Sequence, residues 1–144
     1  MGKTLIVCAT RSGETEKIGD LIAEGIRIAG HEAIVKRVAE IKSEADLQNY
    51  DALVLGSATY HGDMLQSMKS MLFLAEKAQL KGKIGGAFGA FGWSGEASDR
   101  IYDTMKHIFG MDMVGGPLKL KNSSLGGAIR MAQEYGREIA ARLS

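Results

Sequence analysis

The sequence predicts an α/β fold in which a doubly wound, five-stranded parallel sheet carries helices on both faces. Apolar runs alternate with amphipathic segments from one end of the chain to the other, which is the pattern of successive β-α units. The runs are continuously apolar, as expected for strands buried on both faces. At 144 residues the chain is long enough for one domain with a sizeable core, and we expect a single domain over residues 1–144.

Five segments have the composition of strands. They are residues 3–9, 32–38, 51–57, 83–91 and 111–120. The segment at 32–38 is short and more polar than the others, which places it nearer an edge of the sheet. The segment at 111–120 has the pattern of a broken strand, and it contains the only proline of the chain, a residue that suits an edge strand or a bulge.

Between these runs, apolar residues recur at intervals of three and four, the spacing of one buried helix face. The spacing predicts long helices at 18–29, 64–78, 97–108 and 125–143, and a short one at 43–48. Gly30 follows the first of these helices at the position where a glycine commonly ends a helix.

Composition excludes several classes of function. The net charge is +1 and the chain has no basic tract, so nothing indicates binding to nucleic acid or to an anionic membrane. The apolar runs are too short to span a membrane, and the first ten residues lack a signal-peptide pattern. A single cysteine, Cys8, cannot form an internal disulfide and lies in a buried run. We therefore expect a cytoplasmic protein, and a monomer.

The segments that follow the first, third and fourth strands are the most unusual in composition. In open parallel sheets, ligands bind beyond the carboxyl ends of the strands, at the point where the chain switches direction. We therefore expect residues 10–15 ("TRSGET"), 57–63 ("SATYHGD") and 92–97 ("GWSGEA") to form one binding site.

Residues 10–15 combine hydroxyl side chains with a glycine just before a predicted helix. Main-chain N–H groups at such a turn, together with the helix dipole, can bind an anion. The same residues also suit an ordinary helix N-cap. The turn lacks the Gly-Lys-Ser/Thr ending of a nucleotide-binding P-loop, and it has no G-x-G-x-x-G dinucleotide motif.

The other two segments contribute aromatic side chains. Tyr60 and Trp93 could face each other across the strand ends and hold a flat aromatic ligand by stacking. Alternatively, Tyr60 covers the sheet edge, Trp93 belongs to the core, and His61 is a solvated loop residue. An anion site beside two aromatic walls suits a planar heterocycle with a terminal phosphate. FMN meets this description, whereas FAD would also need a place for its adenine.

These three motifs, in this order, resemble the flavodoxin family, and the resemblance covers essentially the whole chain. It is strongest to the flavin domain of flavodiiron proteins, through "FGAFGWSGEA" and "EYGREIA". The resemblance implies the flavodoxin-like strand order 2-1-3-4-5 and FMN as cofactor. It implies that the phosphate is held by Thr10, Arg11, Ser12, Gly13, Glu14 and Thr15. One side of the flavin would be flanked by Ser57, Ala58, Thr59, Tyr60, His61, Gly62 and Asp63. The other side would be flanked by Phe91, Gly92, Trp93 and Gly95.

The function that this resemblance implies is an FMN electron carrier between redox proteins, in which no side chain needs to be catalytic. The alternative is an FMN-dependent NAD(P)H:quinone reductase on the same fold, although the short connections favour the carrier. His61 forms an apparent extra residue between the aromatic residue and the Gly-Asp pair of the family pattern. The three histidines are scattered, so the sequence offers no di-iron or other metal site. A signalling receiver would need an acidic cluster after the first strand, which "TRSGET" lacks.

Overall fold

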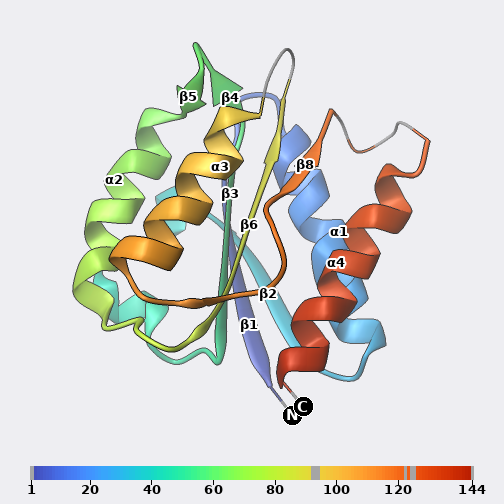
Figure 1. Ribbon diagram of the computed structural model, residues 1–144, viewed down its shortest axis with the longest axis horizontal. Helices are drawn as coiled ribbons and strands as arrows, with labels where there is room; N and C mark the ends of the chain where they lie inside the picture. Colours follow the sequence, from blue (N-terminus) through green and yellow to red (C-terminus); the bar gives the residue numbers. More distant parts are fainter. Residues whose placement is uncertain (1, 92–94, 122, 124–125, 144) are drawn as a thin grey trace.

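The computed structural model describes residues 2–91, 95–121, 123 and 126–143. A central sheet stands between two layers of helices, with α2 and α3 on one face and α1 and α4 on the other (Figure 1). The carboxyl ends of the long strands lie at the upper edge in this view, and both ends of the chain lie at the lower edge. The predicted three-layer α/β fold is confirmed.

The sheet is parallel throughout, and its strand order is β2-β1-β3-β6-β7, with β8 also paired to β6. Its long strands are β1 (Lys3–Ala9), β2 (Glu32–Arg37), β3 (Ala52–Ser57) and β6 (Ile84–Ala90). All six residues of β3 are buried, which agrees with its continuously apolar sequence. The predicted order of the strands is confirmed, and β2 is an edge strand as its polar composition indicates.

The predicted fifth strand is divided into two short strands, β7 (Asp112–Met113) and β8 (Leu118–Leu120). Both pair with β6, and the residues between them include two glycines and Pro117. Gly85 is paired with Met113 and Phe88 with Leu118, so Gly86 and Ala87 lie opposite the break. Proline has no N–H to donate to the hydrogen bonds with β6, which explains why the fifth strand is not continuous from β7 to β8.

Tyr135 of α4 (Ala128–Leu143) satisfies the main chain at this break. Its hydroxyl oxygen accepts the N–H of Ala87 at 2.9 Å, and the hydroxyl lies 3.3 Å from the Ala87 carbonyl oxygen, to which it donates. Only 6% of Tyr135 is exposed. A side chain from the helix layer thus takes the place of a missing strand residue, because a buried peptide group needs a partner.

The helices α1 (Glu14–Ile28) and α4 pack closely against each other on one face of the sheet. Gly25 and Gly136 face each other there. A Cβ atom placed on Gly136 would lie 2.1 Å from the carbonyl oxygen of Ile22, and one on Gly25 would lie 2.0 Å from that of Gln133. The two helix backbones are in direct contact at these positions, which only glycine allows.

The opposite face is covered by α2 (Gln66–Ala75) and α3 (Glu96–Asp103). The predicted helix at 64–78 starts later and ends in a 3-10 turn, Glu76–Ala78. The predicted helix at 97–108 continues past α3 as a π-helical turn, Thr104–Ile108, which buries Met105. The segment at 43–48 forms a single 3-10 turn, Glu44–Leu47. No helix in the described ranges has both the length and the apolar composition to cross a membrane.

Candidate functional site

The predicted ligand-binding segments follow three neighbouring strands, β1, β3 and β6, at their carboxyl ends. The chain leaves β1 through α1 toward β2 and leaves β3 through α2 toward β6, on opposite faces of the sheet (Figure 1). The switch point therefore lies between β1 and β3, where open α/β sheets bind their ligands.

Residues 10–15 form a tight turn that ends in the first turn of α1. The Gly13 N–H donates to the Thr10 hydroxyl at 2.8 Å, and Gly13 has a φ of +88°, a conformation that favours glycine. Helix α1 begins at Glu14, so its first N–H groups have no acceptor within the helix. These donors and the positive end of the helix dipole face the same loop.

The Thr15 side chain supplies a further group for an anion. Thr15 is only 1% exposed, and among the described residues its hydroxyl has no hydrogen-bond partner. A buried hydroxyl without a partner is costly, and an oxygen of a bound phosphate would satisfy it. The turn therefore fits the phosphate of FMN through main-chain N–H groups and hydroxyls.

The charged side chains of the same turn point to other partners. The Glu14 carboxylate accepts the main-chain N–H of Ser123, and hydrogen bonds from Ser123 hold the pKa of Glu14 below its usual value. The guanidinium carbon of Arg11 lies 4.1 Å from the centre of the Tyr60 ring. Ser12 is exposed. Arg11, which the resemblance assigned to the phosphate, is thus engaged by the neighbouring loop.

The second segment starts with residues that fix its backbone. Ser57 is fully buried, and its hydroxyl accepts the Leu65 N–H at 3.0 Å and donates to the Ala58 carbonyl at 2.9 Å. The Ala58 N–H donates to the carbonyl of Ala9 at the end of β1. The Thr59 hydroxyl accepts the Ala97 N–H of α3 at 3.1 Å. These main-chain and side-chain hydrogen bonds therefore hold the loop in place.

The tip of the segment is a β-hairpin that the sequence analysis missed. Strand β4 (Thr59–Tyr60) pairs with β5 (Asp63–Met64), and Tyr60 lies opposite Asp63. His61 and Gly62 form the two-residue turn, with φ values of +52° and +73°. Two positive φ values match the turn type that two-residue hairpins prefer, and a glycine at its second position was the available signal. His61 is thus a turn residue, which accounts for the apparent insertion.

Asp63 anchors the hairpin to the helix layer. Its carboxylate lies 2.6 Å from the Lys69 ammonium nitrogen and 3.6 Å from the Arg100 guanidinium. The hydrogen bond from Lys69 holds the pKa of Asp63 below its usual value. Lys69 and Arg100 could not be predicted as part of the site, because no local sequence pattern indicates which distant cations meet a loop carboxylate.

The third segment is described in part. The Phe91 N–H donates to the Leu120 carbonyl at the end of β8. Gly95 precedes the first turn of α3, and its carbonyl accepts the Ser98 hydroxyl at 3.0 Å. Gly92 and Trp93, which by the resemblance would flank one side of the flavin, lie outside the described residues. Among the described residues, Phe91 therefore lies beside the end of β8, and Ala97 contacts Thr59 of the second segment.

Substituting valine for Gly62 tests whether this hairpin belongs to the binding site. Valine at a φ of +73° costs about 1–2 kcal/mol. In the ligand-free chain the two residues of the turn can relax by changing their φ values, while the anchors at Thr59 and Asp63 stay in place. A ligand bound against the turn would prevent this relaxation. FMN affinity, measured by fluorescence titration, is therefore expected to fall about 5- to 30-fold. Gly82→Val is the matched control, because Gly82 has a φ of +80° and equally open surroundings. Equal losses of affinity in both variants would contradict the assignment.

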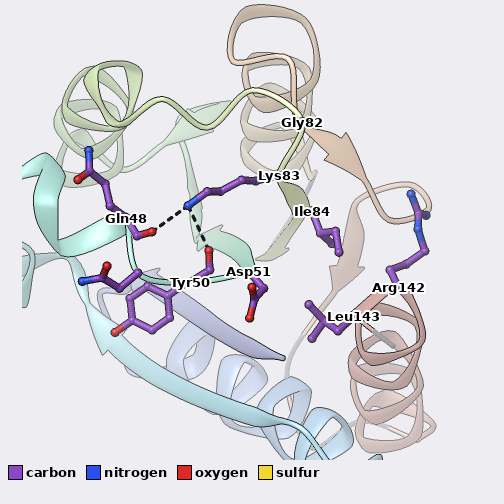
Figure 2. Close-up of a pocket in the computed structure, with 9 residues that line it drawn as sticks. Gln48, Tyr50, Asp51, Gly82, Lys83, Ile84, Arg142 and Leu143 are labelled. Carbon is purple, nitrogen blue, oxygen red and sulfur yellow. Dashed lines mark hydrogen bonds between the residues drawn. The ribbon is translucent and has the colours of Figure 1, made fainter. Parts of the chain in front are cut away.

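A hollow of about 550 Å³ lies at the amino ends of β3 and β6, opposite the predicted site (Figure 2). There the Lys83 ammonium donates to the main-chain carbonyls of Gln48 and Tyr50, at 2.9 and 3.2 Å. Arg142 forms an ion pair with Asp112. Because these charged groups are engaged within the chain, this hollow offers less to a ligand than the loops at the carboxyl ends.

Comparison with known proteins agrees with this fold. The flavodoxin-domain family model matches residues 5–133. Rubredoxin-oxygen oxidoreductase of Megalodesulfovibrio gigas is 31% identical over 90% of this chain, but the chain spans only 34% of that protein. An NAD(P)H dehydrogenase (quinone) of Rhodopseudomonas palustris is 29% identical, over 94% of this chain and 79% of its own. A solved flavodoxin from the domain Archaea superposes with a TM-score of 0.92 at 27% identity, over 98% of both chains.

The fold and the loops define an α/β protein with a candidate site for an anionic ligand at the carboxyl ends of its strands. The family match covers most of the chain, so the chain belongs to the flavodoxin family. FMN is the cofactor of this family, and transfer of electrons to redox partners is its function.

Proposed function

We propose that this chain is an electron carrier that binds FMN at the carboxyl ends of β1, β3 and β6 and exchanges electrons with other redox proteins. The observation that carries the proposal is the buried Thr15 hydroxyl, which lacks a partner among the described residues and lies in the first turn of α1 beside Gly13. It matches a phosphate oxygen, and the exposed Tyr60 stands in the neighbouring hairpin. The bound flavin supplies the redox chemistry, and the chain binds and orients it.

The residues of the three loops take different parts in this proposal. Thr10, Ser12, Gly13 and Thr15 hold the phosphate, together with the main-chain N–H of Glu14. Tyr60, Gly62 and the residues of the turn between them lie along one side of the flavin ring, on a hairpin fixed by Ser57, Ala58, Thr59 and Asp63. Phe91, Gly92, Trp93 and Gly95 line the other side.

Titration with two flavins tests the cofactor. The loop at residues 10–15 offers one phosphate site, and a second nucleotide would need further contacts. We therefore expect one FMN per chain, bound without a covalent bond, and weaker binding of FAD. The purified chain should show the absorbance bands of a flavin, and isothermal titration of the flavin-free protein gives both affinities. Equal affinity for FAD would contradict the proposal.

The alternative is an FMN-dependent NAD(P)H:quinone reductase on the same fold. The observation in its favour is the similarity to the Rhodopseudomonas palustris NAD(P)H dehydrogenase (quinone), of which this chain spans 79%. Mixing the FMN-loaded chain with NADPH without oxygen separates the two functions. The carrier is expected to keep its flavin absorbance until a redox protein supplies electrons, whereas rapid bleaching by NADPH alone would indicate the reductase.

We further propose that residues 1–144 form one domain that acts as a cytoplasmic monomer and binds neither nucleic acid nor membranes. The near-neutral charge, +1, supports the latter part, because binding to polyanions depends on an excess of basic residues. Sedimentation of the FMN-loaded chain over a range of concentrations tests the monomer.

A further inference from the structure

Arg11 and Tyr60 come from two different loops of the candidate site and contact each other across it. The guanidinium carbon lies 4.1 Å from the centre of the tyrosine ring, well within the range of a cation–π interaction. Both residues are exposed, Tyr60 to 48%. The contact therefore links the phosphate turn after β1 to the hairpin after β3.

The backbone on both sides of this contact is fixed independently. The Thr59 hydroxyl ties the hairpin to α3, and Asp63 ties it to Lys69. On the other side, the hydrogen bond from Gly13 N–H to Thr10 closes the turn that carries Arg11. Because these contacts anchor both loops, the Arg11–Tyr60 contact acts mainly on the orientation of the Tyr60 side chain.

Two neighbours restrict that orientation. Arg11 covers one face of the Tyr60 ring, and the His61 ring meets Tyr60 in a T-shaped arrangement with 4.1 Å between the ring centres. A half-exposed aromatic side chain loses rotational freedom when a flat ligand stacks on it. Contacts that hold the ring before binding reduce this entropic cost.

The other cations around the phosphate turn have carboxylate partners. Lys17 lies 4.0 Å from Glu14, and Arg37 lies 2.6 Å from Glu16. Arg11 is directed to an aromatic ring instead. The position of Arg11 thus connects it to the part of the site that would meet the flavin ring.

We propose that Arg11 is a positioning residue that braces Tyr60 for stacking on the flavin ring and does not bind the phosphate. The inference rests on the proposed function, since it assigns Arg11 a part in flavin binding. It predicts that Arg11 contributes equally to the binding of FMN and of riboflavin, which has the same ring but lacks the phosphate.

The first experiment compares the two flavins. Arg11→Gln is expected to weaken binding of FMN and riboflavin by the same factor, about two- to fivefold for an exposed cation–π contact. Arg11→Lys should restore part of both affinities, because lysine keeps the charge but loses the planar group. Arg137→Gln on α4 is the control for the loss of one positive charge, since Arg137 is exposed and lies on a helix away from both loops.

The second experiment needs no flavin. A double-mutant cycle of Arg11→Gln and Tyr60→Leu, followed by denaturant unfolding of the flavin-free chain, measures the contact itself. The expected coupling is about two- to fivefold in the unfolding equilibrium constant. In the Tyr60→Leu background, Arg11→Gln should leave the affinities for both flavins unchanged.

Three results would overturn the inference. Loss of FMN affinity without loss of riboflavin affinity in Arg11→Gln would make Arg11 a phosphate ligand. Tighter binding of both flavins would mean that Arg11 occupies the place of the ring. Absence of coupling between the two substitutions in the unfolding equilibrium constant would show that the contact does not form in the flavin-free chain. If the unsubstituted chain binds neither flavin, the proposed function fails, while the unfolding cycle still decides whether the contact exists.

Discussion

Tyr135→Phe is expected to lower the free energy of unfolding by about 2–4 kcal/mol, although it removes a single oxygen atom. The hydroxyl holds both the N–H and the carbonyl of Ala87, at 2.9 and 3.3 Å, in the buried gap between β7 and β8. Phenylalanine would keep the ring packing but leave two buried main-chain groups without a partner. Each such group costs about 1–3 kcal/mol.

Urea denaturation followed by circular dichroism measures this loss. Tyr102→Phe is the matched control, because it removes the same atom from a half-buried tyrosine on the other face of the sheet. Burial raises the pKa of the Tyr135 hydroxyl, so its contribution is fully present below the ordinary tyrosine pKa of about 10 and is lost as the pH rises from there through the folded-state pKa. The difference in the free energy of unfolding between Tyr135→Phe and the unsubstituted chain should therefore be constant from about pH 6 to 9. A loss no larger than that of the control would mean that water replaces the hydroxyl.

Gly136→Ala is expected to destabilise the chain by about 3 kcal/mol, even though alanine favours helices by about 1 kcal/mol over glycine. The added methyl group would lie 2.1 Å from the Ile22 carbonyl oxygen and 3.1 Å from the Gly25 Cα. These atoms belong to the backbone of α1, so the overlap cannot be relieved by rotating a side chain. The helices α1 and α4 must move apart, which loosens the core they share.

Thermal and urea unfolding of Gly136→Ala quantify this effect. Gly116→Ala serves as control, because a Cβ atom on Gly116 meets nothing within 4 Å and its φ is not in the left-handed region. We expect the control to change stability by less than about 0.5 kcal/mol, as is usual at exposed positions. A mild effect at both positions would show that the helix pair can separate at low cost.

Much of this fold could be predicted because its signals are local. The buried strands are short apolar runs, and the spacing of apolar residues gave the four long helices. The break between β7 and β8 was indicated by Pro117, but its exact position depends on pairing with β6. The role of Tyr135 could not be predicted, because its partner Ala87 is 48 residues away in the sequence. No sequence pattern indicates that a helix side chain completes a sheet.

The candidate site shows the same division. Composition indicated which three loops to consider, and parallel strand order brought the described parts of them to one edge of the sheet. The hairpin at Tyr60 and Asp63 could have been predicted from the glycine of its two-residue turn. The contact between Arg11 and Tyr60 could not, because both residues are compatible with several orientations and their loops are joined only in three dimensions.

The divided strand beyond β6 also affects how chains of this protein meet one another. An uninterrupted outer strand exposes a row of N–H and carbonyl groups on which a second chain can add its own strand, the first step of fibrous aggregation. Here that border consists of strands of two and three residues, separated by glycines and a proline. The peptide group of Ala87, which the interruption would leave open, is already taken by Tyr135. This side of the molecule therefore offers a poor template for intermolecular strand pairing, which favours solubility at high concentration.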